Sequence, residues 1–279
     1  MTAAHGEAAA TPPLALRALR CLSVLDVIQA SGSPGGEATR SLRRSPLDLI
    51  DSGPAAVDAE RDACRASFAA SLGRAERHER PYRHWLLEGV LPVDVAAALD
   101  GLPFEAPPLD GVSGSREIHN NTRRYLDRDA IEAYPVCRAV AEAFQDPRTV
   151  AMVEEVTGAQ LGGCCLRIEY AQDTDGFWLQ PHTDLGVKKF TLLYYLSPET
   201  REDLGTDIYV DAETWSHRAP FTPGAALAFV PSNNTWHGFE PRPIPVVRKS
   251  LIVNYVTEAW RAREQLAYPD RPVRRPRAR

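Results

Sequence analysis

The sequence predicts an α+β fold in which several helices precede a β-sandwich or barrel core. Two observations predict this class. The predicted helical stretches all lie between residues 56 and 157, whereas from residue 161 onward the apolar residues form short runs bounded by Gly, Pro, Asn and Asp. Helices followed by many short strands are typical of an α+β protein. The length of 279 residues suits one large domain, alone or with an appendage.

The composition excludes several classes of protein. Apolar residues make up 44% of the chain and charged residues 25%, which are ordinary globular values and exclude a wholly disordered, collagen-like or coiled-coil chain. The net charge of −5 argues against a nucleic-acid partner. Residues 271–279 (RPVRRPRAR) hold five arginines and no acid, so residues 1–270 carry −10. No apolar run reaches the ~18 residues of a membrane helix, so no membrane partner is expected.

Cysteine usage indicates the compartment. The five cysteines are odd in number and show no C-x-x-C spacing, so we expect neither a disulfide framework nor a structural zinc site. A reducing cytoplasm is the expected location. The apolar run at 14–28 is interrupted by three charged residues and no small-residue cleavage site follows it, so no secretory signal is expected. The oligomeric state is left open.

Three segments are predicted: an N-terminal extension (1–80), a main domain (81–260) and a basic tail (261–279). Residues 1–55 are rich in Ala, Pro, Gly, Ser and Arg, a composition that buries little surface. Residues 56–79 predict a helix, because apolar residues recur there at helical spacing, namely Val57, Cys64, Phe68 and Leu72.

The main domain is predicted to begin with a strand within 81–92 and a short helix at 93–101. Two further helices are expected at 130–144 and 147–157, the second ending at Gly158. Beyond these helices the sequence predicts strands in CCLRIEYA, FTLLYYLS, TDIYVDA, GAALAFVP and SLIVNYVTEA.

Two histidines have informative surroundings. His182 and Asp184 form an H-x-D pair in LQPHTDLG, and residues two apart on an extended chain project from the same face. His237 follows the predicted strand GAALAFVP. Two imidazoles and one carboxylate make the facial triad of non-haem Fe(II) enzymes. The H-x-D spacing often arises by chance, and alone it favours a hydrogen-bonded pair at a strand end.

The residues that follow favour the metal site. Arg248 lies eleven residues beyond His237, and Ser250 shares its face of the predicted strand. An arginine at the base of a pocket is a rigid bidentate donor for a carboxylate, and a serine hydroxyl adds a third hydrogen bond. Apolar neighbours such as Leu251 and Val253 argue against a surface ion pair. The combination suits a 2-oxo acid that also chelates a metal.

In these features the sequence resembles the Fe(II)/2-oxoglutarate-dependent dioxygenases, over about residues 81–260. The resemblance implies a double-stranded β-helix (jelly-roll, cupin-like) core with flanking N-terminal helices. It implies that His182, Asp184 and His237 are catalytic ligands of Fe(II), and that Arg248 and Ser250 bind the far carboxylate of the co-substrate 2-oxoglutarate.

The layout is most similar to the prolyl-hydroxylase-like branch of that family. This similarity implies that Tyr195, and with a loop about two residues longer also Tyr170, contribute to co-substrate binding. A role as an ordinary strand aromatic is the competing interpretation for both tyrosines; it is about as strong as the functional one for Tyr170, whereas for Tyr195 the functional role is favoured. The carboxylate at Asp184 implies hydroxylation or another C–H oxidation with release of succinate and CO2, because the related halogenases lack it.

The substrate is the least determined part. REIHNNTRRYLD concentrates amides and guanidiniums, including Asn121, Arg123 and Arg124, and such groups suit a small polar substrate with a carboxylate or phosphate. A solvated loop with surface ion pairs is the competing interpretation. Further residues flank the metal ligands and are candidates for either the pocket wall or packing, namely Trp178, Gln180 and Trp236.

Two other functions remain open at this stage. A cupin-like metal enzyme would use the same triad without 2-oxoglutarate, but it would have no need of Arg248 and Ser250. A non-catalytic jelly-roll binding protein would have no need of an intact metal triad.

Overall fold

The computed structural model describes residues 54–109, 114, 123–184, 186–196 and 198–275, which lie within one compact unit, Arg43–Arg279. In this part of the chain the α-helices are α1 (Pro54–Gly73), α2 (Val93–Asp100), α3 (Arg128–Ala133), α4 (Pro135–Gln145) and α5 (Pro147–Thr157).

The helices follow the predictions with two differences. The helix expected at 130–144 is divided into α3 and α4, because Pro135 disfavours a helical conformation at Tyr134, whose φ and ψ are −124° and 110°. The first helix ends at Gly73 rather than residue 79, and a short strand follows it. Helix α5 matches its prediction and ends at Gly158, where a φ of 79° suits glycine.

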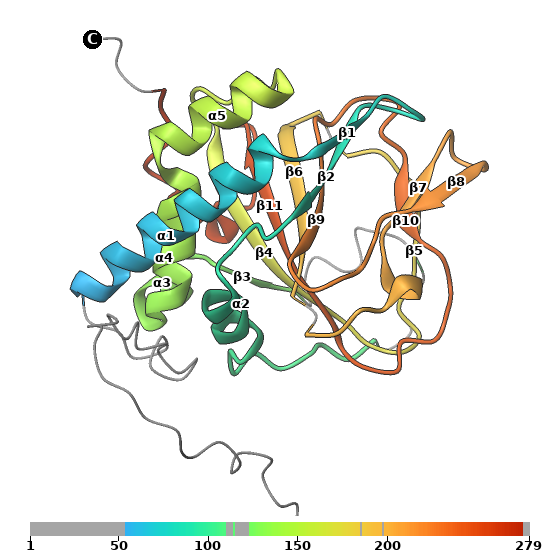
Figure 1. Ribbon diagram of the computed structural model, residues 1–279, viewed down its shortest axis with the longest axis horizontal. Helices are drawn as coiled ribbons and strands as arrows, with labels where there is room; N and C mark the ends of the chain where they lie inside the picture. The colour runs from blue at the N-terminus through green and yellow to red at the C-terminus, as the bar shows by residue number, and fades with distance from the viewer. Residues whose placement is uncertain (1–53, 110–113, 115–122, 185, 197, 276–279) are drawn as a thin grey trace, which may run out of the picture. The chain divides into compact units, whose positions relative to one another are not determined.

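The strands form two antiparallel sheets (Figure 1). The large sheet has the order β1-β2-β9-β6-β11-β4-β3 and the small sheet the order β5-β10-β7-β8. The strands of the large sheet are β1 (Glu76–His78), β2 (His84–Glu88), β9 (Ala225–Phe229), β6 (Lys188–Tyr195), β11 (Arg248–Val256), β4 (Cys165–Asp173) and β3 (Arg124–Tyr125). Those of the small sheet are β5 (Leu179–His182), β10 (His237–Phe239), β7 (Asp207–Tyr209) and β8 (Trp215–Arg218).

The path of the chain between the sheets defines the architecture. The chain runs from β4 in the large sheet to β5 in the small one, back to β6, across to β7 and β8, and then through β9, β10 and β11 in alternation. Four strands of the large sheet (β4, β6, β9 and β11) thus form one layer, and the four strands of the small sheet form the other. Eight strands in two layers with these crossings form a jelly roll. This topology confirms the predicted α+β class with a jelly-roll core.

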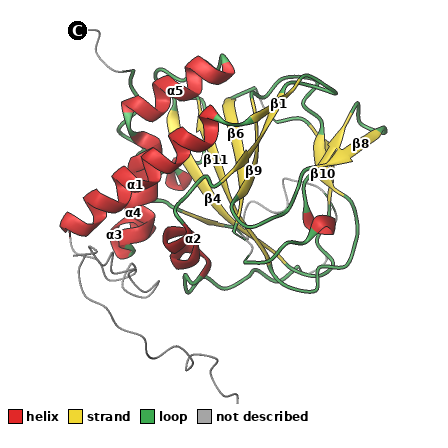
Figure 2. Ribbon diagram, viewed as in Figure 1, coloured by secondary structure: helices red, strands yellow, loops and turns green. Residues whose placement is uncertain are grey.

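The two faces of the large sheet pack against different parts of the molecule. On one face, residues such as Leu251, Val253 and Tyr255 of β11 pack with the helices in the larger hydrophobic core. On the other face, toward the small sheet, β11 presents Arg248 and Ile252. Figure 2 shows the helices α1 to α5 gathered on one side of the large sheet and the small sheet on the other.

The helical layer is held by aromatic and aliphatic packing. Phe68 of α1 contacts Phe144 of α4 with ring centroids 5.0 Å apart, and Tyr255 of β11 donates a hydrogen bond to the carbonyl oxygen of Phe144 at 2.5 Å. Cys64 and Cys137 are free thiols buried in this layer, and burial raises the pKa of each to about 12. Among the described residues, no helix combines the length and hydropathy that crossing a bilayer requires.

Candidate metal centre

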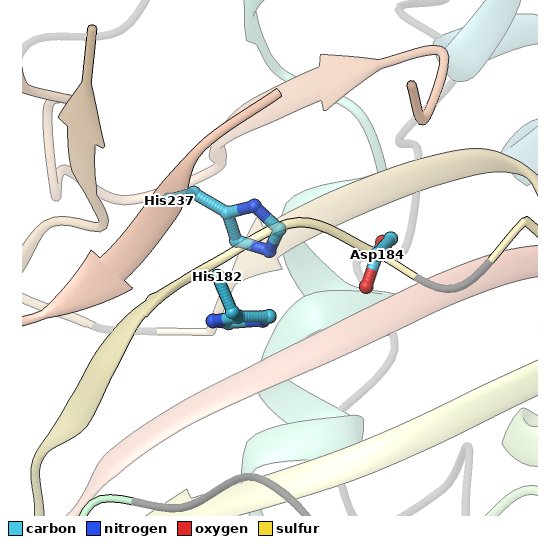
Figure 3. A group of neighbouring side chains, drawn as sticks. All are labelled: His182, Asp184 and His237. Atoms are coloured by element: carbon cyan, nitrogen blue, oxygen red, sulfur yellow. The ribbon is translucent and has the colours of Figure 1, made fainter. Parts of the chain in front are cut away.

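His182, Asp184 and His237 meet at one end of the small sheet (Figure 3). His182 ends β5, His237 begins β10, and the two residues are directly paired in the register of these strands. Their imidazole rings have centroids 4.3 Å apart. Asp184 follows β5 by two residues, and one ligand atom from each of the three side chains lies within 4.8 Å of the others. The predicted H-x-D…H residues are therefore brought together as a group that could hold a metal ion.

Hydrogen bonds fix both imidazoles in the form that a metal requires. Nδ1 of His182 lies 3.0 Å from the carbonyl oxygen of Gln180, and Nδ1 of His237 lies 2.9 Å from that of Thr235. A carbonyl oxygen only accepts, so Nδ1 carries the hydrogen in each ring. Nε2 then carries the lone pair that a metal ligand uses.

The carboxylate of Asp184 is held from both sides. The ammonium group of Lys188, at the start of β6, donates to Oδ1 at 2.9 Å, and the hydroxyl of Thr191 donates to Oδ2 at 2.7 Å. Asn254 of β11 in turn donates to Thr191 Oγ1 at 3.0 Å. All four side chains are buried. These bonds orient the carboxylate toward the two histidines, as the outer partners of a ligating carboxylate do.

A divalent transition metal fits this set of donors. Two imidazole nitrogens and one carboxylate oxygen on neighbouring strands match the facial arrangement that binds Fe(II) and leaves positions open for further ligands. The neutral imidazole form and the oriented carboxylate mean that little rearrangement is needed before a metal binds.

The metal group opens into a pocket between the two sheets. Both charged and apolar side chains line it, namely Arg123, Glu169, Asp173, Phe177, Leu179, His182, Asp184, Lys188, Thr191, Leu193, Thr206, His237, Phe239, Arg248 and Ile252. We refer to it as the site pocket. The described residues of its lining include the metal-binding group, three cations and three carboxylates, one of which is Asp184 of the metal-binding group itself.

Arg248 lies in the site pocket, as the sequence predicts, but its nitrogens already have partners. Nε donates to the carbonyl oxygen of Leu204 at 2.7 Å, Nη1 to Asp173 Oδ2 at 2.5 Å, and Nη2 to Thr206 Oγ1 at 3.4 Å. The guanidinium also lies over the ring of Phe239, 4.7 Å from its centroid. Arg248 is thus fixed at the start of β11 by a carboxylate of the neighbouring strand.

The two other predicted neighbours of Arg248 lie close to it. Ser250 shares its face of β11 and is buried, and its hydroxyl has no hydrogen-bond partner among the described residues. Tyr195 is fully buried opposite Ser250, with its ring 5.7 Å from the Arg248 guanidinium. Its hydroxyl donates to Thr206 Oγ1 at 2.9 Å, and burial raises its pKa. Neither side chain lines the site pocket directly.

Tyr170 lies on the opposite face of the large sheet. Its hydroxyl donates to the carbonyl oxygen of Leu99 at 2.9 Å, and its ring packs against Phe104 in the helical core. Strand alternation explains this position, because Glu169 and Asp173 of β4 are the residues that face the site pocket. The structure therefore does not bring Tyr170 to the co-substrate residues.

Of the predicted substrate residues that the structure describes, only Arg123 lines the site pocket. It is ion-paired with Glu169 and, at 3.7 Å, with Asp173. Arg124 is exposed on β3, and Asn121 lies outside the described residues. Trp178 packs against the backbone of Gly114, where even a Cβ atom would lie 2.1 Å from the indole.

The last two substrate candidates lie on or next to the small sheet. Gln180 is exposed on β5 and its backbone N–H donates to the carbonyl oxygen of Gly114 at 2.9 Å. Trp236 is partly buried beside β7, and its carbonyl oxygen accepts from the backbone N–H of Tyr209 at 3.0 Å.

Several residues of the site pocket were not predicted from the sequence. Asp173 and Glu169 carry a signal that could have found them, since charges alternate with apolar residues along the strand CLRIEYAQD. Arg167 continues this charged face, donating to Glu169 Oε2 at 2.8 Å. Lys188 and Thr191 carry no comparable signal, because their role depends on how β6 packs beside Asp184.

Comparison with known proteins gives structural similarities only. No family model matches the chain, and no curated protein matches it by sequence. The fold is similar to a prolyl-4-hydroxylase from Pseudomonas putida, with 15% identity over 70% of this chain and 98% of that chain and a TM-score of 0.45. It is also similar to a prolyl hydroxylase from Trichoplax adhaerens, which was solved in complex with a hypoxia inducible factor oxygen degradation domain peptide fragment. That match has 13% identity over 77% of this chain and 98% of that chain, and a TM-score of 0.47.

A third similar structure is HygX from Streptomyces hygroscopicus with nickel and 2-oxoglutarate bound, at 15% identity over 62% of this chain and 82% of that chain and a TM-score of 0.40. The function proposed next rests on the geometry of the site itself.

Proposed function

We propose that this protein is an oxygenase that uses Fe(II) and 2-oxoglutarate to oxidise a C–H bond of a small polar substrate. The observation that carries the proposal is the meeting of a His–Asp–His group and a buried arginine in one pocket of a jelly roll. His182, Asp184 and His237 would hold the iron. Arg248, with Ser250 and Tyr195 beside it, would receive the far carboxylate of 2-oxoglutarate.

The protein's own residues supply orientation and a dry site. The iron, when bound, supplies the redox chemistry with O2 that no amino-acid side chain provides. Lys188 and Thr191 hold Asp184 in place, while Phe177 and Phe239 line the site pocket and exclude water from it. Since the carboxylate of Asp184 is part of the donor set, the proposed reaction is hydroxylation or another C–H oxidation rather than halogenation, with 2-oxoglutarate converted to succinate and CO2.

Arg123 indicates the character of the substrate. It lies on the wall of the site pocket, with its guanidinium 5.7 Å from the ring centroid of Phe177. A polar group with negative charge, such as a carboxylate or phosphate, suits this position.

A two-step experiment tests the proposal. Fe(II) and then 2-oxoglutarate are added to the protein without O2, and a visible charge-transfer band is expected from the chelate. O2 is then admitted and succinate is measured. His237→Ala, which removes one metal ligand, is the matched control and is expected to show neither signal. Absence of both signals in the wild-type protein would reject the proposal.

One observation favours a second function, a metal enzyme of this fold that does not use 2-oxoglutarate. Arg248 is already paired with the carboxylate of Asp173 and so does not need an external one. In that case the protein would bind Fe(II), but 2-oxoglutarate would neither bind to the metal-loaded protein nor be consumed.

A further inference from the structure

Asp173 lies between two arginines in the site pocket. It is directly opposite Arg248 in the pairing of β4 with β11, and its Oδ2 lies 2.5 Å from Nη1 of Arg248. Its other oxygen, Oδ1, lies 3.7 Å from Nη2 of Arg123. The exposed fraction is 3% for Asp173 and 6% for Arg248, so water screens this pair weakly.

An external carboxylate has limited access to Arg248. Nε and Nη2 of the guanidinium donate to Leu204 and Thr206, and Nη1 donates to Asp173. Nη1 and Nη2 each keep a second N–H, so a second carboxylate can pair with Nη1 either beside Asp173, where the two negative charges repel each other, or by displacing Asp173.

We infer that Asp173 is an internal competitor that occupies the carboxylate position on Arg248 and lowers the affinity for the 2-oxo acid co-substrate. This inference rests on the function proposed above. It adds a residue that neither the sequence motifs nor the metal group identifies, and it assigns that residue an effect opposite to the effect of Arg248.

Arg123 makes displacement of Asp173 feasible. A buried carboxylate that loses its partner is costly, but Asp173 already faces a second arginine and can pair with it when Nη1 is taken. Thr206, which accepts from Arg248 and from Tyr195, would keep the guanidinium in place during the exchange.

The charges that line the site pocket fit this exchange. Among the described residues that line the pocket, three cations, Arg123, Lys188 and Arg248, accompany three carboxylates, Glu169, Asp173 and Asp184. A divalent metal adds two positive charges and a dianionic 2-oxo acid adds two negative ones, so the loaded pocket is again balanced. Because the pocket without metal is already balanced, the dianion is expected to bind well only after the metal.

The test compares co-substrate affinity in variants of Asp173. Each protein is loaded with Mn(II) without O2 and titrated with 2-oxoglutarate by calorimetry. In Asp173→Asn the internal carboxylate is replaced by a neutral group of similar shape, and the Kd for 2-oxoglutarate is expected to fall about tenfold, the effect of one charge-assisted hydrogen bond. Arg248→Ala is expected to raise the Kd by a similar factor or more.

Glu169→Gln separates direct competition from the net charge of the pocket. Both substitutions remove one negative charge from the pocket lining, but Glu169 pairs with Arg123 and Arg167 rather than with Arg248. Its effect on the Kd is expected to be clearly smaller than that of Asp173→Asn. Equal effects would assign the change to charge alone and overturn the inference.

Further outcomes are equally decisive. If Asp173→Asn binds 2-oxoglutarate no better than the wild-type protein, Asp173 orients Arg248 and the inference is wrong, although the proposed function stands. If the wild-type protein binds Mn(II) but neither it nor Asp173→Asn binds 2-oxoglutarate, the proposed function fails as well. Asp173→Ser provides a second neutral variant if the amide does not fold, with folding checked by thermal melting.

Discussion

Single residues around Asp184 are expected to control metal affinity. Thr191 donates to the carboxylate of Asp184 and accepts from Asn254, so it connects a ligand to the rigid strand β11. In Thr191→Val this bond is lost while the volume is kept. The Kd for Co(II) is then expected to rise about tenfold or more, as is typical when an outer partner of a metal ligand is removed.

Thr149→Val is a suitable control for that variant. Thr149 is also buried, but its hydroxyl donates to Ala143 in the helical layer at 2.7 Å. It is expected to lower the free energy of unfolding without changing the Kd for Co(II). If the two variants bind Co(II) equally well, Thr191 does not position Asp184.

His84 is expected to make stability depend on pH. It is fully buried on β2, its Nε2 has no hydrogen-bond partner in the described part of the chain, and it faces His78, His217 and Glu76. Burial is the main cause that lowers its pKa to about 4. The carbonyl oxygen of Tyr82 and the Glu76 carboxylate oppose this shift, and the two neighbouring histidines add to it. The unfolded chain takes up the proton at about pH 6.5 and the folded chain only near 4, so stability falls as the pH drops through this window.

The size of this effect is about 3 kcal/mol from pH 6.5 to pH 4. It is measured by urea denaturation at several pH values, in the wild-type protein and in His84→Gln. The variant is expected to lose less stability on acidification, and the difference between the two curves isolates His84 from the other histidines. Parallel curves would contradict the assignment.

The residues of the site differ in how far the sequence could predict them. The metal ligands and Arg248 stand at motif positions, and the structure places all four in the site pocket. Asp173 is different, because its partner follows 75 positions later and the register of β4 with β11 alone brings them together. The prediction for Tyr170 depended on spacing along the chain. The direction of its side chain depends instead on the alternation of side chains along β4, which points Tyr170 away from the pocket.

Among the elements, strands β5 and β10 hold the two histidines and must lie very close to each other. Gly238 follows His237, and a Cβ atom there would lie 2.7 Å from the carbonyl oxygen of Leu179 and 3.2 Å from the backbone of Gln180. In Gly238→Ala the two strands are expected to separate, which weakens Co(II) binding. The accompanying loss in free energy of unfolding is expected to be about 1–3 kcal/mol, as for other overpacked sites.

Gly162→Ala is the matched control for this element. A Cβ atom at Gly162 would contact nothing within 4 Å, and no positive φ is recorded for it. This variant is expected to bind Co(II) like the wild-type protein. Unchanged binding in Gly238→Ala would show that the spacing of β5 and β10 does not limit the site.

Element length explains which parts of the fold could be predicted. The long apolar strands β4, β6, β9 and β11 and the helices α4 and α5 overlap the predicted segments. Strands β5, β8 and β10 have only three or four residues and contain polar side chains, so no periodicity marks them. These short strands form because the longer strands hold the two ends of each of them in place. A local sequence pattern does not contain this information.

At the scale of the whole molecule, residues on the helical face of the large sheet are expected to affect the free energy of unfolding but not metal binding on the opposite face. Phe68 packs against Phe144 in the helical layer, on the face opposite to the site pocket. Phe68→Ala is expected to lower the free energy of unfolding by about 3–5 kcal/mol. Because the jelly roll retains its metal group, the Kd for Co(II) of the folded protein is expected to stay unchanged.

Two measurements check this separation, urea denaturation for stability and Co(II) titration well below the unfolding midpoint for binding. Val253→Ala, on the same face of β11, provides a second variant of the helical core. A large rise in the Kd for Co(II) in both variants, with the proteins still folded, would show that the two faces are coupled.

The alternation of side chains along β4 and β11 has a consequence for how such a protein can diverge. One set of alternate positions holds the ion pairs of the pocket, and the interleaved set holds the hydrophobic core, so a one-residue insertion or deletion within either strand would exchange the two sets. Substitutions at the pocket-facing positions carry no such penalty. Lineages that descend from this chain are therefore expected to acquire new specificity by replacing every second residue of these strands, while changes in length accumulate in the loops.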